Sequence, residues 1–402
     1  MRHVGYASFD YTPTKRGFLS HTGYFQGEID YYTKNFTVPS SFVGALNLTG
    51  YDWWQNVSVA RTAVDATTYS QDLMMTELER VLSAYNQSGH ANSDQPLFLF
   101  FANQIVHVPL DSPGEEYVQR CLDAGMPGSQ DPLRLTYCAM MLKLDDNLGQ
   151  LIGLLKDYGM WDDTLLLVST DNGGDPPSGS FPPSAGCNWP LRAGKGTVFE
   201  GGVRSVCFFN GGANVFPEAR RGSTIEGLAH IVDWFPTMLS LANVSAALVP
   251  EGLDGFDLTP ALFQGLPLSR DSIPLNIDFN ISFPPDWGHQ VSVLSSDGWK
   301  LIRQKVHGHV MNYDGYFPCL PAQKIAANTT ESGNYLFNVL DDPAEHNNLY
   351  DSLPDQVSRL DQILDSYVKS GYRHSQFNSF DPLGAPQLHD GVWAPYLKQA
   401  SN

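Results

Sequence analysis

The feature that most constrains the fold is an apolar run at residues 164–168, Thr-Leu-Leu-Leu-Val, which directly precedes an acidic and glycine-rich segment at residues 169–204. A short, continuous apolar run is typical of a strand buried on both faces of a parallel sheet. The acidic tip then lies at the carboxyl end of the strand. Because ligands of open α/β sheets bind in the crevice beyond these strand ends, we expect a site here.

Helical and strand-like segments alternate along residues 1–262. The clearest helix has apolar residues spaced alternately by three and four, and it ends at Gly159. We expect helices at 68–85, 132–158 and 231–242, and buried strands at 96–101, 164–168 and 203–209. This alternation predicts an α/β fold with a mostly parallel sheet flanked by helices.

The sequence pattern changes after about residue 262. Two strand-like runs, 291–294 and 299–302, flank Asp297-Gly298, which is a strong hairpin signal. A further strand at 335–340 and an amphipathic helix around Leu360 follow. We therefore predict a main α/β domain at 1–262 and a small C-terminal α+β subdomain, with antiparallel strands and a helix, at 263–402.

Charge and composition limit the classes of molecule that the protein is expected to bind. The chain has 24 basic and 43 acidic residues, a net charge of −19, which disfavours nucleic acid and anionic membranes as partners. No apolar run approaches the roughly 20 residues that span a bilayer, so no transmembrane segment is expected. An anionic substrate needs a local basic pocket, and the sequence does not give the oligomeric state.

Glycosylation signals favour the secretory pathway. Seven N-x-S/T sequons occur, at Asn35, Asn47, Asn56, Asn86, Asn243, Asn280 and Asn328. Single matches are weak, but seven together favour export. The N-terminus has no apolar signal-peptide region. Either the protein is not exported or the chain lacks its true beginning.

The five cysteines are too few and too dispersed for a disulfide framework or a zinc site. Cys121 and Cys138 are close enough in sequence to form a local bridge. The odd count leaves at least one thiol free or paired outside the chain, and a buried free thiol is an equal alternative for Cys207, in its apolar strand.

The acidic tip could bind a metal. Asp171 and Asn172 offer a carboxylate and an amide oxygen, the hard donors that Ca²⁺ or Mg²⁺ prefers. Two donors do not make a site, because Ca²⁺ takes roughly 6 to 8 oxygens, so other loops would have to supply the remainder. A solvated Asp-Asn-Gly-Gly turn explains the local sequence equally simply.

Basic residues downstream could bind an oxyanion. Arg192 and Lys195 flank Gly194, and a guanidinium and an ammonium both suit sulfate or phosphate. A solvated basic loop is the alternative. His107, just beyond an expected strand, could hydrogen-bond an anion or protonate a leaving oxygen, although a lone histidine is more often structural.

Several blocks together resemble the sulfatase family, and within it the arylsulfatase B-like group. They are STDNGG at 169–174, NWPLRAGKGTVFEGGVR at 188–204, QIVHVPL at 104–110, HIVDWFPTML at 230–239, LDGFDL at 253–258, DGWKL at 297–301 and LFNVLDDPAEHNNL at 336–349. The resemblance covers nearly the whole chain. It implies an alkaline phosphatase-like sulfatase fold and hydrolysis of sulfate esters of sugars or aryl alcohols.

The resemblance also assigns roles to residues. Asp171 and Asn172 match Ca²⁺ ligands, Lys195 matches the lysine that binds sulfate oxygen, and His107 matches the histidine at the sulfate ester. The opening segment makes His3 the histidine that assists the formylglycine nucleophile, although the family lysine two residues earlier falls on Met1. By the resemblance the protein is secreted or lysosomal.

Two family features are absent from the 402 residues: the Asp-Asp pair of the first strand, and the C-x-P-x-R motif whose Cys becomes formylglycine. The expected strands at 96–101 and 165–168 remain fully apolar, although loss of a neighbouring strand would expose them. We therefore expect an N-terminally truncated sequence, lacking the first-strand region, rather than a dedicated pseudoenzyme. The chain as given is expected to be inactive.

Two other functions are compatible with parts of the sequence. A related phosphodiesterase or phosphatase would need a second metal cluster of Asp and His, and the region around Asp171 supplies no such histidine. A non-catalytic protein that binds sulfated glycans would keep the oxyanion pocket without the chemistry.

Overall fold

The computed structural model describes residues 5–38, 48–61, 66–89, 95–126, 131–177, 183–277, 290–304, 315–319, 333–370 and 381–397. The chain forms two compact units. The first unit comprises Met1–Trp161, Ser180–Ser184 and Asn378–Asn402, and the second comprises Asp162–Gly179 and Ala185–Phe377. The division between these compact units lies near Trp161. It does not test the predicted domain boundary at residue 262, which stays a prediction.

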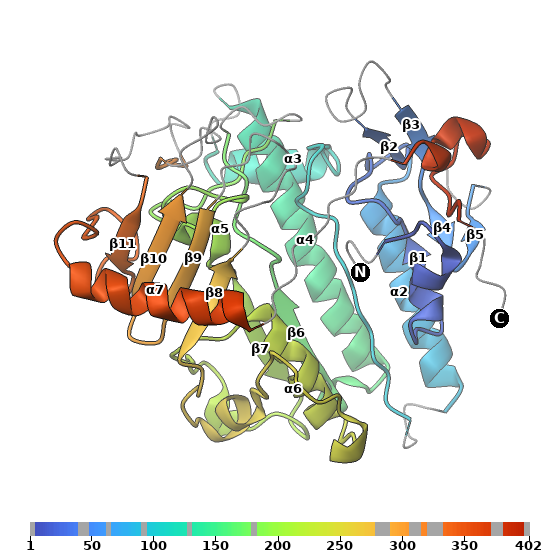
Figure 1. The fold of residues 1–402 in the computed structure, drawn as a ribbon. Coiled ribbons are helices and arrows are strands. Elements are labelled where there is room, and N and C mark those ends of the chain that lie inside the picture. The colour runs from blue at the N-terminus through green and yellow to red at the C-terminus, as the bar shows by residue number, and fades with distance from the viewer. Residues whose placement is uncertain are drawn as a thin grey trace. The chain divides into compact units, whose positions relative to one another are not determined.

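Three helices dominate the first unit: α2 (Ser70–Gln87), α3 (Glu115–Asp123) and α4 (Pro132–Asp157) (Figure 1). The two helices predicted at 68–85 and 132–158 are confirmed. Helix α4 begins where its sequence provides a cap, because the Asp131 carboxylate accepts the Arg134 backbone N–H at 2.9 Å and Pro132 stands at the first helical position.

Short strands complete the first unit. They are β1 (Thr22–Gly23), β2 (Asn35–Val38), β3 (Leu48–Tyr51), β4 (Trp54–Gln55) and β5 (Ser58–Val59). Strand β4 pairs with β1 and β5, and β2 pairs with β3, all antiparallel. The core includes Tyr31, whose ring stacks on Tyr69 at 4.8 Å and packs in the same cluster as Met140 of α4.

The segment predicted as a buried strand at 96–101 is not a strand, so this prediction was wrong. Phe98, Leu99 and Phe100 are 61%, 39% and 55% exposed. The physical reason is that an apolar run forms a strand only where a second strand pairs with its backbone, and no described residue does so.

The second unit contains the strand predicted at residues 164–168. Strand β6 (Leu165–Ser169) pairs with β7 (Cys207–Gly211) from Leu165 opposite Gly211 to Ser169 opposite Cys207. The two strands run antiparallel. Within the described part of the chain, the pairs between named strands are all antiparallel, and an isolated bridge between Tyr51 and Val392 is parallel. The expected mostly parallel sheet is therefore not found there.

The antiparallel direction follows from the route between the two strands. Parallel neighbours need a crossover that returns the chain to the far end of the sheet. Here the Thr170 N–H donates to Val206 O at 2.9 Å, so the intervening segment leaves β6 and rejoins β7 at the same end. Its only helix in the described residues is the four-residue α5 (Glu200–Val203).

Besides short 3₁₀ and π segments, the second unit also contains α6 (Trp234–Leu241) and a sheet covered by a helix. The sheet has the order β11 (Tyr335–Asn338), β10 (Trp299–Gln304), β9 (Gln290–Ser295), β8 (Ser272–Asn276), and α7 (Pro354–Lys369) packs on it (Figure 1). The Asp297-Gly298 hairpin is confirmed, with Gly298 at φ +86°. The predicted C-terminal strands and helix are therefore present.

Two hydrophobic faces of this sheet are buried. One face packs against Leu360 and Leu364 of α7. The opposite face, with Ile302 and Phe337, shares a core with Val198 and Phe199. This shared core explains why the C-terminal sheet and residues 185–204 belong to one compact unit.

Four of the five cysteines form disulfides. Cys121–Cys138 joins α3 to α4, as the sequence suggested, and Cys187–Cys319 is a bridge that the sequence did not reveal. Cys207 is unbridged, one of the two possibilities that the odd count left open, and it is exposed on β7, so the alternative of a buried thiol does not apply to it. No helix in the described ranges is long and apolar enough to cross a membrane.

Candidate functional site

The acidic tip lies at the end of β6, as predicted. Asp171 is exposed and Asn172 is half-buried. The Val206 N–H donates to Thr170 Oγ1 at 3.1 Å, which fixes the residue immediately before the tip. The Asn172 side-chain amide donates to Gly173 O at 2.7 Å, and this orientation leaves the amide oxygen as the acceptor. The tip therefore presents two hard oxygen donors on adjacent residues.

The glycines that follow pack too closely for any side chain. The Gly173 N–H donates to Gly202 O at 2.9 Å, and a Cβ at Gly173 would lie 1.8 Å from the carbonyl oxygen of Gly201. This backbone oxygen cannot move aside as a side chain could. The turn is therefore built into the protein rather than free in solvent, which disfavours the simple solvated-turn alternative.

Asn188 holds two loops together. Its side-chain oxygen accepts the Gly174 N–H at 2.7 Å, and its side-chain nitrogen donates to Gly174 O at 2.9 Å and to Ala193 O at 3.0 Å. The sequence reading did not single out Asn188. Its signal was its place in the NWPLR block, next to the residues chosen for their charge.

Lys195 belongs to the same loop cluster. Its backbone N–H donates to Gly174 O at 3.0 Å, and its side chain is half-buried. Gly194 also packs closely, since a Cβ there would lie 2.5 Å from Gly174 O. The structure thus brings the segment that carries Lys195 against the turn that carries Asp171 and Asn172.

Arg192 does not lie where the sequence reading expected. It is 1% exposed, and its guanidinium lies 4.2 Å from the ring centre of Phe199 and 4.9 Å from that of Tyr335. Its Nη1 donates to Glu345 O at 3.4 Å. A guanidinium enclosed by aromatic rings is held by cation–π contacts, and this position suits packing better than binding a dissolved ester.

The donors at the tip fit Ca²⁺ in kind but not in number. Asp171 and Asn172 supply two oxygens, whereas Ca²⁺ takes roughly 6 to 8. Among the residues that the structure describes, no cluster of three or more His, Cys, Asp or Glu side chains could hold a metal ion. The predicted Ca²⁺ site therefore stays a prediction with two named ligands.

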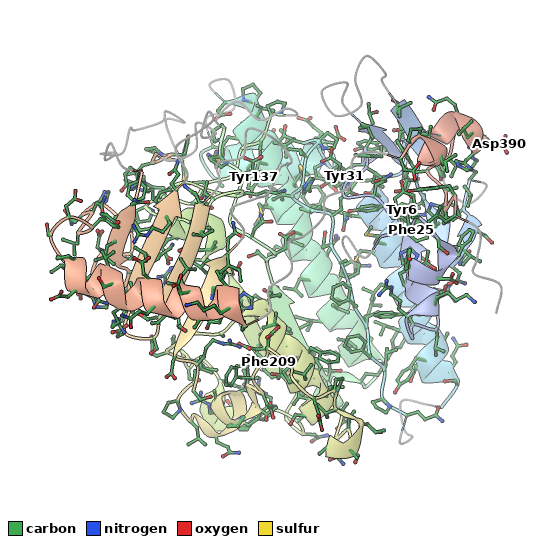
Figure 2. All side chains as sticks on the ribbon, in the orientation of Figure 1. Tyr6, Phe25, Tyr31, Tyr137, Phe209 and Asp390 are labelled. Atoms are coloured by element: carbon green, nitrogen blue, oxygen red, sulfur yellow. A yellow bond between two sulfur atoms is a disulfide. The ribbon has the colours of Figure 1, made fainter. Side chains whose placement is uncertain are left out.

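His107 lies in the first unit and is described by itself. Its carbonyl oxygen accepts the hydroxyl of Tyr31 at 3.0 Å, and its N–H donates to Gln104 O at 2.9 Å. Tyr31 is labelled in Figure 2. Its Nδ1 lies 2.9 Å from Val108 O and 3.2 Å from a Glu28 carboxylate oxygen. Two acceptors at Nδ1 favour the tautomer with the proton on that nitrogen.

The sequence reading missed Glu28, which stands in an irregular, aromatic-rich segment with no local signal. His3, the other predicted catalytic histidine, lies outside the described residues. The arrangement therefore offers two separate sets of groups: a cation with hard donors in the second unit, and an oriented imidazole in the first.

Relatives of the chain are sulfatases. Arylsulfatase J of Mus musculus is 30% identical over 417 residues, which cover 99% of this chain and 64% of that protein. Arylsulfatase A of Bos taurus is 30% identical over 300 residues, which cover 74% of this chain and 52% of that protein. The chain thus spans between about half and two thirds of the length of these relatives.

A solved structure supports the fold. The crystal structure of Ps i-CgsB in complex with k-i-k-neocarrahexaose matches with a TM-score of 0.64 at 22% identity, over 92% of this chain and 70% of that chain. The model of the Sulfatase family matches residues 1–244, more than half of the 402. The predicted α/β sulfatase fold and arylsulfatase-like character are confirmed, and the chain belongs to the sulfatase family.

Proposed function

We propose that this protein is a sulfuric ester hydrolase that acts on the sulfate ester of a sugar or an aryl alcohol. The observation that carries the proposal is the bond from the Lys195 N–H to Gly174 O at 3.0 Å. This bond connects two segments. One carries Lys195, the lysine expected to bind sulfate, and the other is the turn that carries Asp171 and Asn172, the two expected metal ligands. In a molecule with a net charge of −19, such a local cation is what an anionic ester needs.

Each residue of this cluster has a chemical role in the proposal. The Lys195 ammonium binds sulfate oxygens as a compact point charge. Asp171 and Asn172 would supply two of the ligands of a Ca²⁺ ion, and such an ion would stabilise negative charge on the sulfate oxygens. Arg192, assigned to substrate binding from the sequence, is left out because it is buried against Phe199.

His107 has a role at the leaving group only by the family resemblance. Val108 O and Glu28 both lie against Nδ1, so Nε2 is the ring nitrogen that could exchange a proton with a ligand. The family resemblance alone assigns His107 to the departing alcohol oxygen, where Nε2 would donate a proton as a general acid. His3 assists release of sulfate, a role that rests on the family resemblance alone.

The cysteines limit what these 402 residues do by themselves. The family nucleophile is a formylglycine made from the Cys of a C-x-P-x-R motif. Here four cysteines are in disulfides, and Cys207 is followed by Phe-Phe-Asn-Gly. We therefore expect this chain to bind a sulfate ester without hydrolysing it.

The same observation supports a second candidate, a non-catalytic protein that binds sulfated glycans. The two candidates share the Lys195 site and differ in whether a nucleophile ever acts there. In either case the sequons and the two disulfides support a secreted or lysosomal location, because disulfides persist in oxidising compartments.

Calorimetric titration with inorganic sulfate and with a sulfated monosaccharide tests the site. We expect Lys195→Ala to weaken binding about tenfold or more, because a charge-assisted hydrogen bond contributes roughly 1.5 to 3 kcal/mol. Lys369→Ala is the matched control, since Lys369 lies on α7 with its side chain 78% exposed. Equal affinities for the two variants would overturn the proposed role of Lys195.

An aryl sulfate assay separates chemistry from binding. The purified chain should bind the ester and release no alcohol. Turnover at a rate typical of sulfatases would show that the argument from the cysteines is wrong. Hydrolysis that appears only when a C-x-P-x-R segment is joined to the chain would favour the hydrolase over the glycan-binding protein.

A further inference from the structure

A buried ionic cluster lies behind the proposed sulfate site, within the second unit. Lys300 of β10 is 0% exposed, and its Nζ is 2.9 Å from Glu200 Oε1 and 2.9 Å from Glu345 Oε1. Glu345 is also fully buried, and its second carboxylate oxygen accepts the Glu200 backbone N–H at 2.7 Å. Arg204 Nε donates to the second oxygen of Glu200 at 2.6 Å.

The charges of the cluster compensate one another. Two carboxylates face one ammonium and one guanidinium, so no charge in the cluster lacks a partner of opposite sign. Burial raises the pKa of Glu345. Burial acts in the same direction on Glu200, but Lys300 and Arg204 outweigh it and lower the pKa of that carboxyl. Removing Lys300 therefore leaves Glu345 buried without a cation, which is strongly unfavourable.

Glu200 links this cluster to the loops of the site, because it is the first residue of α5. The next residue, Gly201, donates its N–H to Arg192 O at 2.8 Å, three residues before Lys195. The carbonyl of Gly202 accepts the Gly173 N–H at 2.9 Å, directly after the Asp171-Asn172 pair. One short helix thus contacts both loops.

These contacts leave little room for independent movement. A Cβ at Gly201 would lie 2.4 Å from Arg192 O, and a Cβ at Gly202 would lie 2.4 Å from Thr197 O. Backbone therefore packs on backbone at both points. A displacement of Glu200 must be transmitted to the two loops, because closely packed interiors transmit strain.

We propose that Lys300 and Glu345 are positioning residues that, through Glu200, hold the loops bearing Asp171, Asn172 and Lys195. Their effect on sulfate binding rests on the proposed function. Their effect on the loops does not, because it follows from the contacts of Glu200 alone. The C-terminal sheet thereby sets the geometry of a site to which it contributes no ligand.

Hydrogen exchange measured by mass spectrometry tests the positioning directly. We expect Lys300→Met to raise exchange of the Gly173 amide at least tenfold, together with that of amides in residues 192–204. Exchange in α7 should stay unchanged. Lys300→Arg, which keeps the positive charge, should recover at least part of the protection.

Arg303→Met is the matched control. Arg303 lies on the same strand, β10, but its Nε donates to Asp361 of α7 at 3.0 Å, away from Glu200. This variant should leave the Gly173 amide protected. Equal exchange at Gly173 in Lys300→Met and Arg303→Met, or a rise spread evenly over the whole chain, overturns the proposal.

Two further arms keep the test decisive. If Lys300→Met does not fold, Glu345→Gln takes its place, because the amide still accepts the Glu200 N–H but no longer pairs with the ammonium. Titration with inorganic sulfate then separates the two claims. Local exchange that rises without any sulfate binding by the wild-type chain supports positioning and rejects the proposed function, and unchanged exchange with intact sulfate binding does the reverse.

Discussion

At the scale of single residues, Asp52 is a buried carboxyl, outside the proposed site, whose pKa is strongly changed by folding. It is 0% exposed, and it accepts N–H groups from Gln26 at 2.7 Å, from Phe25 at 3.0 Å and from the Trp54 indole at 2.8 Å. Burial raises its pKa to about 7 in spite of these hydrogen bonds, which act to lower it.

This pKa predicts how stability depends on pH. Between pH 3.8, the ordinary pKa, and about pH 7, the carboxyl of Asp52 is protonated in the folded state and ionised in the unfolded state. Stability from this group is therefore fully present below about pH 4 and is lost as pH rises through about 7. We expect the free energy of unfolding of the wild-type chain to fall between pH 5 and 8 by about 2 kcal/mol more than that of Asp52→Asn.

Urea unfolding at the two pH values measures this difference. The comparison with Asp52→Asn is needed because other groups titrate in the same range. Burial lowers the pKa of His21 to about 4, so its contribution has the opposite sign and is lost as pH falls. An equal change from pH 5 to 8 in both proteins would mean that Asp52 does not titrate there.

The sequence allowed us to choose candidate site residues from their local chemistry. It did not predict where each side chain lies in the folded protein. Asp171, Asn172 and Lys195 could be chosen from their donor types and the blocks around them. The burial of Arg192 could not, because the Tyr335 and Phe337 rings that enclose it come from a strand more than a hundred residues away in sequence. From the sequence alone, a charged residue close to a glycine is expected to be exposed to solvent, because the distant residues that bury it are not known.

At the scale of elements, the same contrast separates helices from strands. The periodicity of α4 and its cap at Asp131 lie within one segment, so the sequence alone predicts them. The direction of β6 relative to β7 depends on the path of the intervening segment, which has no periodic signal. The hairpin at Asp297-Gly298 was predictable because the turn itself specifies it.

The bridge between α3 and α4 gives a prediction at this scale. Cys121–Cys138 spans 17 residues, and closing a loop of that size stabilises a protein by about 3 kcal/mol. We expect the double variant Cys121→Ala/Cys138→Ala to lose about that much free energy of unfolding, measured by urea denaturation. The α3–α4 packing around Tyr117 and Ala139 should persist, because it is hydrophobic.

Cys207→Ala is the control for that measurement. Cys207 is exposed and unbridged, so its replacement should change the free energy of unfolding by less than about 0.5 kcal/mol. Equal stability of the double variant and the wild-type chain would mean that the bridge does not form in the folded protein.

At the scale of the whole molecule, the disulfides and the sequons bear on the proposed secreted or lysosomal location. The two disulfides are compatible with the proposed location, because disulfides persist in oxidising compartments. Glycan attachment further requires that the acceptor asparagines be accessible. The described sequon residues Asn35, Asn56, Asn86 and Asn243 are all at least partly exposed.

Among the sequon asparagines that the structure describes, Asn56 and Asn243 are the strongest candidates for glycosylation. Both are exposed and both have positive φ, +56° and +51°, as is typical of asparagine in turns. We expect the chain, expressed behind a secretory leader, to carry glycans that peptide N-glycosidase removes. Asn56→Gln and Asn243→Gln should each remove one glycan in a gel-mobility assay, and Ser58→Ala should reproduce the effect of Asn56→Gln.

Asn214→Gln is the control, because Asn214 is exposed but stands outside any sequon. A secreted chain without glycans at both sites would contradict the assignment to the secretory pathway, since accessible sequons in that pathway are acceptors.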